Sequence, residues 1–89
     1  MDDLDKRVSQ TVAVLQQATK EHGVFVTVDG RVGEVDAAAL VGYAPGTLRN
    51  MRSAGGGPAF FNRPLSGSAK SYRLHDLATW LERAREETI

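Results

Sequence analysis

The chain has 89 residues, 42% of them hydrophobic and 25% charged, and its basic and acidic side chains cancel to a formal net charge of zero. So short a sequence buries only about 60% of its unfolded surface, which allows one compact core and at most one accessory element. With no cysteine and only two histidines, it offers neither a disulfide framework nor a zinc ligand set, so we expect no metal and no cofactor. Its apolar runs are shorter than a membrane span and its acidic first residues are unlike a signal peptide, so we expect a cytoplasmic protein that does not bind membranes.

Charge is unevenly distributed along the chain. Residues 1–36 contain seven acidic and four basic residues, a balance of minus three. From Ala37 to His75 there is no acidic residue, and this window contains five cationic residues: Arg49, Arg52, Arg63, Lys70 and Arg73. An acid-free window of this kind is typical of a surface that faces a polyanion. Chance clustering on a solvated face is the alternative.

The first predicted element is an amphipathic helix over residues 4–22. Its apolar side chains recur every three or four residues and form one stripe. The stripe consists of Leu4, Val8, Val12, Leu15 and Ala18. Gly23 is expected to end the helix. The stripe needs an apolar partner, either the core of the domain or a second copy of itself, and we expect it to mediate a homodimer.

Residues 24–32 carry the pattern of a strand or short hairpin. Val24, Val26 and Val28 alternate with Phe25 and Thr27, which is the period of a strand. The dipeptide that follows at 29–30, Asp-Gly, is a strong tight-turn signal. The predicted helix and this segment together form an N-terminal extension, residues 1–32.

Two short helices are predicted next. Gly33 can cap the first, which continues through an alanine-rich stretch and ends at Gly42. Pro45 suits the first position of the second helix, which extends over residues 46–54 and is stopped by the Gly-Gly-Gly-Pro sequence at 55–58. Two short helices joined across three residues have the pattern of a helix-turn-helix.

The remaining residues predict a hairpin and a closing helix. Residues 59–63 and 70–74 are strand-like and flank a turn-rich segment at 64–69, which predicts a wing with a loose tip. An amphipathic helix is expected from His75 onward. Its predicted apolar face consists of Leu77, Trp80, Leu81 and Ala84.

The sequence DAAALVGYAPGTLRNMRSAG at residues 36–55, followed by the hairpin and by YRLHDLATWL at 72–81, resembles the excisionase and MerR-like winged helix-turn-helix family. The resemblance covers residues 36–81. Its diagnostic elements are Ala37-Ala38, Gly42, Pro45, Thr47-Leu48, Gly55 and Asp76-Leu77-x-x-Trp80-Leu81. The sequence departs from the family in two places: Ala44 replaces the usual Ser or Thr cap, and the wing tip at 66–68 lacks the common arginines. The resemblance implies a DNA-binding domain.

Helical geometry separates the two faces of the second helix of this pair. Leu48 and Met51 share one face with Ala44 and are expected to point into the core. On the opposite face, Arg49 can contact guanine and Asn50 can contact adenine in the major groove, unless the two side chains are merely solvated or touch phosphate only.

The wing cations are expected to contact phosphate or the minor groove, with packing along the hairpin as the alternative for Arg73. The full set of predicted DNA-binding residues is Gly46, Thr47, Arg49, Asn50, Arg52, Ser53, Arg63, Ser68, Lys70 and Arg73.

Catalytic patterns are not supported. The glycines at 55–57 lack the Lys-Ser/Thr ending of a phosphate-binding loop, so a helix stop explains them better. No nucleophile elbow surrounds the serines near His75 and Asp76, and Asp76 is expected to help cap the last helix. We therefore expect neither an enzyme nor a small-molecule substrate.

Taken together, the sequence predicts a small α+β protein. A winged helix-turn-helix DNA-binding domain is expected over residues 33–89, preceded by the extension at 1–32. The expected function is sequence-specific binding of double-stranded DNA as a phage or mobile-element regulator of the excisionase type. A small terminase-like packaging subunit is the alternative within DNA binding. A protein-interaction module, acting as a non-DNA adaptor or inhibitor, is the alternative from a different class, because it fits the acidic N-terminal segment and the low net charge.

Overall fold

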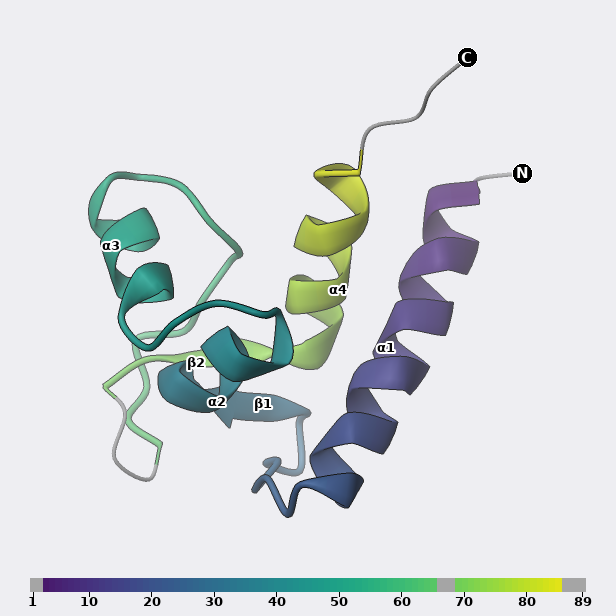
Figure 1. Ribbon diagram of the computed structural model, residues 1–89, viewed down its shortest axis with the longest axis horizontal. Helices are drawn as coiled ribbons and strands as arrows, with labels where there is room; N and C mark the ends of the chain where they lie inside the picture. The colour runs from purple at the N-terminus through teal and green to yellow at the C-terminus, as the bar shows by residue number, and fades with distance from the viewer. Residues whose placement is uncertain (1–2, 66–68, 86–89) are drawn as a thin grey trace.

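The computed structural model describes residues 3–65 and 69–85. Within these ranges the chain has a small α+β fold with four helices and a two-stranded antiparallel sheet. The elements are α1 (Asp3–Glu21), β1 (Arg31–Gly33), α2 (Glu34–Leu40), α3 (Thr47–Ser53), β2 (Ser71–Arg73) and α4 (Leu74–Arg83). Figure 1 shows α1 and α4 side by side, with the short sheet, α2 and α3 next to them.

The predicted amphipathic helix is confirmed, and its stripe packs within the chain. α1 runs antiparallel to α4 (Figure 1) and buries Val8 and Leu15 in the core. One acid at the end of α4 ties the helices together: Arg7 Nε donates to Glu82 Oε1 at 3.1 Å and Thr11 Oγ1 donates to Glu82 Oε2 at 2.9 Å. The first of the two partner arrangements considered for the stripe, the core of the same chain, is therefore the one observed.

All six elements contribute to one apolar core. Its buried members are Val8, Leu15, Val32, Ala37, Ala38, Leu48, Tyr72, Leu74, Leu77 and Ala78. Each helix or strand alone exposes an apolar side that cannot be stable in water, and packing them together removes this surface from solvent. The core thus fixes the position of α3 relative to the sheet and to α4.

The sheet pairs segments that the sequence did not predict as partners. β1 lies antiparallel to β2, with Arg31 opposite Arg73 and Gly33 opposite Ser71. The strand predicted at 24–28 is wrong, because residues 24–27 belong to no helix or strand.

Local hydrogen bonds explain why the valine segment does not pair with β1. The Thr27 N–H donates to the Arg31 carbonyl at 2.9 Å, and Thr27 Oγ1 accepts the Arg31 N–H at 2.8 Å. These bonds close a tight loop around the predicted Asp-Gly turn, in which the Gly30 N–H donates to the Thr27 carbonyl at 2.9 Å. The Arg31 N–H is therefore bound by the Thr27 hydroxyl instead of by a backbone carbonyl, and the backbone pairing of a hairpin does not continue.

α2 has the predicted boundaries. Gly33 is its N-cap, and the chain reverses at Gly42, whose φ of +84° lies in the left-handed region that glycine adopts without strain. The N–H of Tyr43 donates to the Ala38 carbonyl at 2.8 Å, which completes the C-terminal cap.

α3 begins later than predicted. Its first residue is Thr47, and its N-cap Gly46 has a φ of +90°, which is incompatible with a right-handed helix. Pro45 therefore lies in the turn, and its assignment as the first helical residue is wrong. The turn between α2 and α3 is longer, and α3 is correspondingly shorter, than the sequence pattern indicates.

The predicted wing lacks a regular first strand. Residues 59–63 form no named strand, and they meet β2 through a bridge between Phe61 and Ser71, with N–H to carbonyl distances of 2.8 and 3.1 Å. Pro58 and Pro64 bound this segment and cannot donate to a ladder, which limits its pairing. The predicted wing tip, residues 66–68, lies outside the described residues.

α4 closes the core as predicted, with two differences at its ends. Leu77 and Ala78 are buried, but Ala84 follows the helix as its C-cap and is exposed. The N-cap is Arg73, which makes no side-chain cap; Asp76 lies in the first turn, where its carboxylate favours the positive end of the helix dipole. No helix among the described residues combines the length and the apolar character needed to cross a membrane.

Candidate nucleic-acid interface

The outward face of α3 presents polar side chains to solvent. Arg49, Asn50 and Ser53 are exposed, whereas Leu48 on the opposite face is fully buried. Within residues 3–65 and 69–85, neither Arg49 nor Asn50 has a side-chain hydrogen bond or ion pair. α3 therefore holds one side in the core and leaves two strong hydrogen-bonding groups available to a ligand.

The other residues predicted on either face of this helix differ in their exposure. Thr47 and Gly46 are half-buried at the start of the helix, and Met51 is half-buried on the core side. Ala44 is exposed, so the prediction that it faces the core is wrong. The cause is Gly46, because its left-handed backbone ends the helical periodicity from which the position of Ala44 was inferred.

Arg52 was predicted to face DNA, but it is held inside the protein by Glu34. Its Nε and Nη2 donate to the two carboxylate oxygens at 2.7 and 3.1 Å, which is a bidentate pair. Tyr72 Oη donates to Glu34 Oε2 at 2.6 Å, and the Arg52 guanidinium lies 5.7 Å from the centre of the Phe60 ring. The side chains of Arg52 and Glu34 are 18% and 14% exposed. Arg52 thus connects α3 to α2 and β2.

The electrostatics of this cluster agree with its geometry. The hydrogen bond from Arg52 lowers the pKa of the Glu34 carboxyl, and the hydrogen bond from Tyr72 acts in the same direction against the effect of burial. Burial raises the pKa of the Tyr72 phenol, and its bond to Glu34 raises it further. Glu34 is therefore charged and Tyr72 neutral at pH 7, as the hydrogen bonds require.

Three residues of the predicted wing, Arg63, Lys70 and Ser68, differ in their surroundings. Arg63 is exposed and has no ion-pair partner in the described part of the chain. Lys70 Nζ donates to Asn62 Oδ1 at 2.5 Å, a neutral partner that leaves its charge uncompensated. Ser68 lies outside the described residues.

Arg73 belongs to a second acid-arginine cluster, centred on Asp29. Arg73 Nη2 lies 3.6 Å from Asp29 Oδ2, and Arg31 Nε donates to the same carboxylate at 2.9 Å. The two guanidinium groups lie 5.0 and 5.6 Å from the centre of the Phe61 ring. Hydrogen bonds from Thr27 and Arg31 lower the pKa of Asp29 to about 2. This cluster anchors the segment around Phe61 to the turn before β1.

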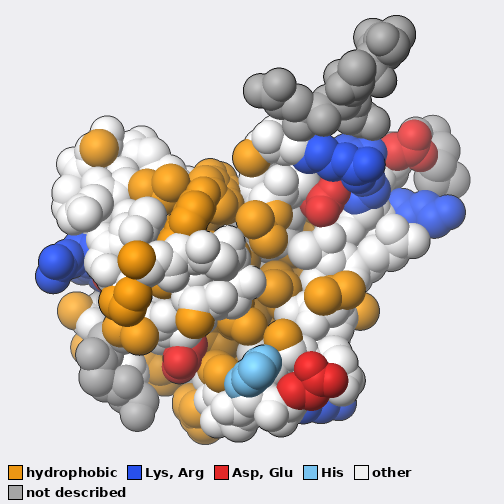
Figure 2. Space-filling view, viewed as in Figure 1, with side chains coloured by type: hydrophobic (Ala, Val, Ile, Leu, Met, Phe, Trp, Pro, Cys, Tyr) orange, Lys and Arg blue, Asp and Glu red, His pale blue; other side chains and the backbone are white. Residues whose placement is uncertain are grey.

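The fold changes the charge balance inferred from the acid-free window. Of its five cations, Arg52 and Arg73 are paired with acids that precede the window, Glu34 and Asp29. The three that form no ion pair with a described acid are Arg49, Arg63 and Lys70, although the charge of Arg49 also helps to lower the pKa of the Glu34 carboxyl. Figure 2 shows cationic side chains at the left edge of the molecule between α3 and the wing segment, and mixed charges over the upper ends of α1 and α4.

The sequence pattern identified the cations but not the acids, Asp29 and Glu34, with which two of them pair. Asp29 sits two residues from Arg31 across a predicted turn, a spacing that could have indicated their pairing. Glu34 is 18 residues from Arg52 and carries no local signal of its pairing.

The site holds no cluster that suggests metal chemistry, since no group of three or more potential ligand side chains was found among the residues described. No protein-family model, no curated protein and no solved structure matches the chain.

Proposed function

We propose that the protein binds duplex DNA sequence-specifically, with α3 in the major groove and the segment around Arg63 and Lys70 on the backbone or in the minor groove. In this proposal α2, the Gly42 turn and α3 act as a helix-turn-helix, and residues 59–73 act as its wing. The arrangement of the strands supports it. β1 precedes the helix pair and pairs with one edge of β2, and Phe61, in the segment proposed as the wing, pairs with the other edge. The biological role we propose is that of an excisionase-type regulator.

The observation that carries the proposal is the exposed pair Arg49 and Asn50 on α3. Neither side chain forms a hydrogen bond or ion pair with a described residue, and the other side of the helix is fixed in the core by Leu48. A helix fits the major groove of B-DNA, where arginine can bind guanine and asparagine can bind adenine through paired hydrogen bonds. Merely solvated side chains at positions 49 and 50 would not require α3 to be fixed in the core.

The cations without acidic partners supply the second requirement, which is attraction to phosphate. Arg63 and Lys70 lie on the wing segment, and Arg49 adds a third positive charge on α3. Contacts of this kind position a protein on DNA without reading its sequence, and they make the affinity depend on salt. A net charge of zero for the whole chain does not oppose this, because the acids that neutralise the total lie elsewhere or are already paired.

The decisive experiment selects duplexes from a random pool with the full chain and then measures binding of variants by fluorescence anisotropy. Arg49→Ala and Asn50→Ala are each expected to weaken binding to the selected site by about 1 to 3 kcal/mol, while binding to random duplex changes much less. Arg83→Ala is the matched control, because Arg83 is an exposed arginine at the end of α4. Absence of salt-dependent binding to any duplex would contradict DNA binding, and equal losses on both duplexes would contradict base recognition.

A homodimer through residues 4–22 stays a prediction, and the packing of α1 restricts how it could form. Val8 and Leu15 are covered by the chain itself, so a second copy would have to use another side of the helix, such as the one that exposes Val14. Two copies would place two reading heads on neighbouring half-sites. Static light scattering at tens of micromolar decides the question: the mass of a monomer rejects the dimer, and twice that mass supports it.

A further inference from the structure

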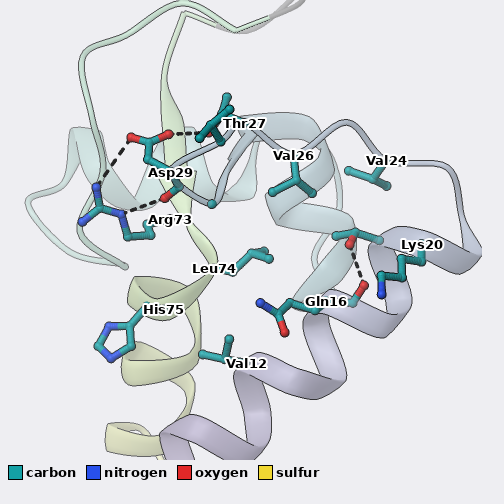
Figure 3. Close-up of a pocket in the computed structure, with 13 residues that line it drawn as sticks. Val12, Gln16, Lys20, Val24, Val26, Thr27, Asp29, Arg73, Leu74 and His75 are labelled. Carbon is teal, nitrogen blue, oxygen red and sulfur yellow. Dashed lines mark hydrogen bonds and ion pairs between the residues drawn. The ribbon is translucent and has the colours of Figure 1, made fainter.

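A groove lies on the molecule away from α3, between α1, the loop at 24–30 and the start of α4. We call it the valine groove, and its volume is about 660 Å³. Its apolar walls are formed by Val12, Val24, Val26, Val28 and Leu74. In Figure 3 the side chains of Val12, Gln16 and Leu74 converge at its floor, while Val24 and Val26 follow the loop. Val28 at the end of this loop is fully exposed.

The loop that borders the groove has backbone groups available for pairing. Between residues 24 and 28, the backbone N–H groups of Phe25, Val26 and Val28 have no backbone hydrogen bond within the described chain, whereas those of Val24 and Thr27 do. The alternating valines of this segment are typical of a strand, yet no strand in the described part of the chain pairs with it. A segment with strand character and unpaired backbone groups can accept an added strand from another chain.

The polar residues of the groove give it a positive character at both ends. Figure 3 places Lys20 at one end and His75 and Arg73 at the other. Lys20 is exposed and has no ion pair with any described residue. At the opposite end, Asp29 is the one acid among the described residues that line the groove. Arg31, which does not line the groove, holds Asp29 at 2.9 Å, and Arg73 lies 3.6 Å from it. Lys20 therefore provides a full uncompensated positive charge at one end, and Arg73 keeps part of its charge at the other.

We propose that the valine groove binds an extended segment of a partner protein in which apolar residues alternate with acidic ones. The apolar residues would pack on the half-buried Val12, Val24 and Val26, the acidic ones would lie near Lys20 and Arg73, and the peptide backbone would pair with the loop. A second copy of the groove fits less well, because it would bring positive side chains together. The groove contains no residue of α3 but shares Arg73 with the proposed wing, so peptide and DNA would approach each other only at Arg73.

The test uses a probe peptide of seven alternating glutamate and valine residues, blocked at both ends and labelled with fluorescein, together with the same peptide carrying lysine for glutamate. Binding to the full chain is measured by anisotropy in low salt and mapped by amide chemical shifts. The glutamate peptide is expected to bind saturably, with shifts concentrated at residues 12–20, 24–30 and 73–75, and the lysine peptide is expected not to bind. No binding at millimolar peptide, equal binding of both peptides, or shifts centred on α3 would overturn the proposal.

Two pairs of variants separate the groove from general surface effects. Lys20→Glu is expected to weaken binding of the glutamate peptide about fivefold, whereas Lys6→Glu, an exposed lysine of α1 outside the groove, leaves it unchanged. Val28→Ser is expected to weaken it about threefold and Val14→Ser, an exposed valine elsewhere on α1, to have no effect. These side chains are exposed, so folding is retained; equal effects within either pair would reject the groove as the binding site.

Discussion

The two arginines of α3 lie three positions apart in the sequence, as neighbours on the helix surface, yet they are in different surroundings. Arg49 is exposed, and no described residue pairs with it, whereas Arg52 is held bidentately by Glu34 and packs near Phe60. The sequence alone gives them similar surroundings, since both lie in the acid-free window. Whether the fold brings an acid to a cation therefore decides whether the charge of that cation is available to a ligand. On α3 one arginine secures the helix, which leaves the other able to act on a ligand.

Removing Arg52 should destabilise the protein far more than removing Arg49. Arg52→Ala should lower the free energy of unfolding by about 2 to 3 kcal/mol, because it removes two hydrogen bonds from a largely buried carboxylate. Arg49→Ala should change it by no more than about 0.5 kcal/mol, as expected for an exposed side chain. Urea unfolding followed by circular dichroism measures both values. Equal stability of the two variants would contradict the assignment of a structural role to Arg52 but not to Arg49.

A second prediction compares wing cations with and without an acidic partner. Arg63→Gln and Lys70→Gln should each flatten the dependence of log K on log salt concentration by about one unit on every duplex. Arg73→Gln should flatten it less, because Asp29 already neutralises part of the Arg73 charge. Titrations at several salt concentrations provide the slopes. If Arg73→Gln flattened the slope as much as Arg63→Gln, Arg73 would have to leave Asp29 and bind phosphate in the complex.

The third and smallest effect is a pH dependence of stability caused by the two paired acids. The pKa of Glu34 is lowered from its ordinary value of 4.5, and that of Asp29 from 3.8 to about 2. A lowered folded-state pKa gives stability that is present above the ordinary value and lost as the pH falls through the folded value. The free energy of unfolding should therefore decline from about pH 5 toward pH 2. Glu34→Gln should make this decline shallower, and an unchanged profile would show that Glu34 does not contribute to it.

Periodicity and glycine positions were sufficient to predict several elements. The stripe of α1 predicted its length and its buried side, because each turn of an amphipathic helix repeats the same signal. Gly23, Gly42 and Gly55 marked the ends of three helices, since a left-handed residue after a helix is a local requirement. Leu48 was correctly placed in the core and Arg49 and Asn50 on the surface by helical geometry.

The errors occur where contacts distant in sequence decide the structure. The valines at 24–28 have the alternation of a strand, but β1 pairs with β2 some 40 residues later, and nothing in the local pattern identifies that partner. The same reason explains Arg52, whose helical position faces outward until Glu34 and Tyr72 are brought to it by the fold. Gly46 shows a third cause, because the sequence permits a helix there and the backbone adopts a left-handed turn instead.

The position of Glu82 has a consequence for how the chain reaches its fold. Its carboxylate binds Arg7 and Thr11, 75 and 71 residues earlier in the sequence. β1 likewise pairs with β2, which follows it much later in the chain. Because synthesis is N-terminal first, α1 emerges long before the helix that covers its apolar stripe. We expect slower folding than in helical proteins of this size whose contacts are mostly local, since the longest loops must close before the core is complete. During that interval Val8 and Leu15 are exposed, and this is the stage at which the nascent chain is most prone to aggregation.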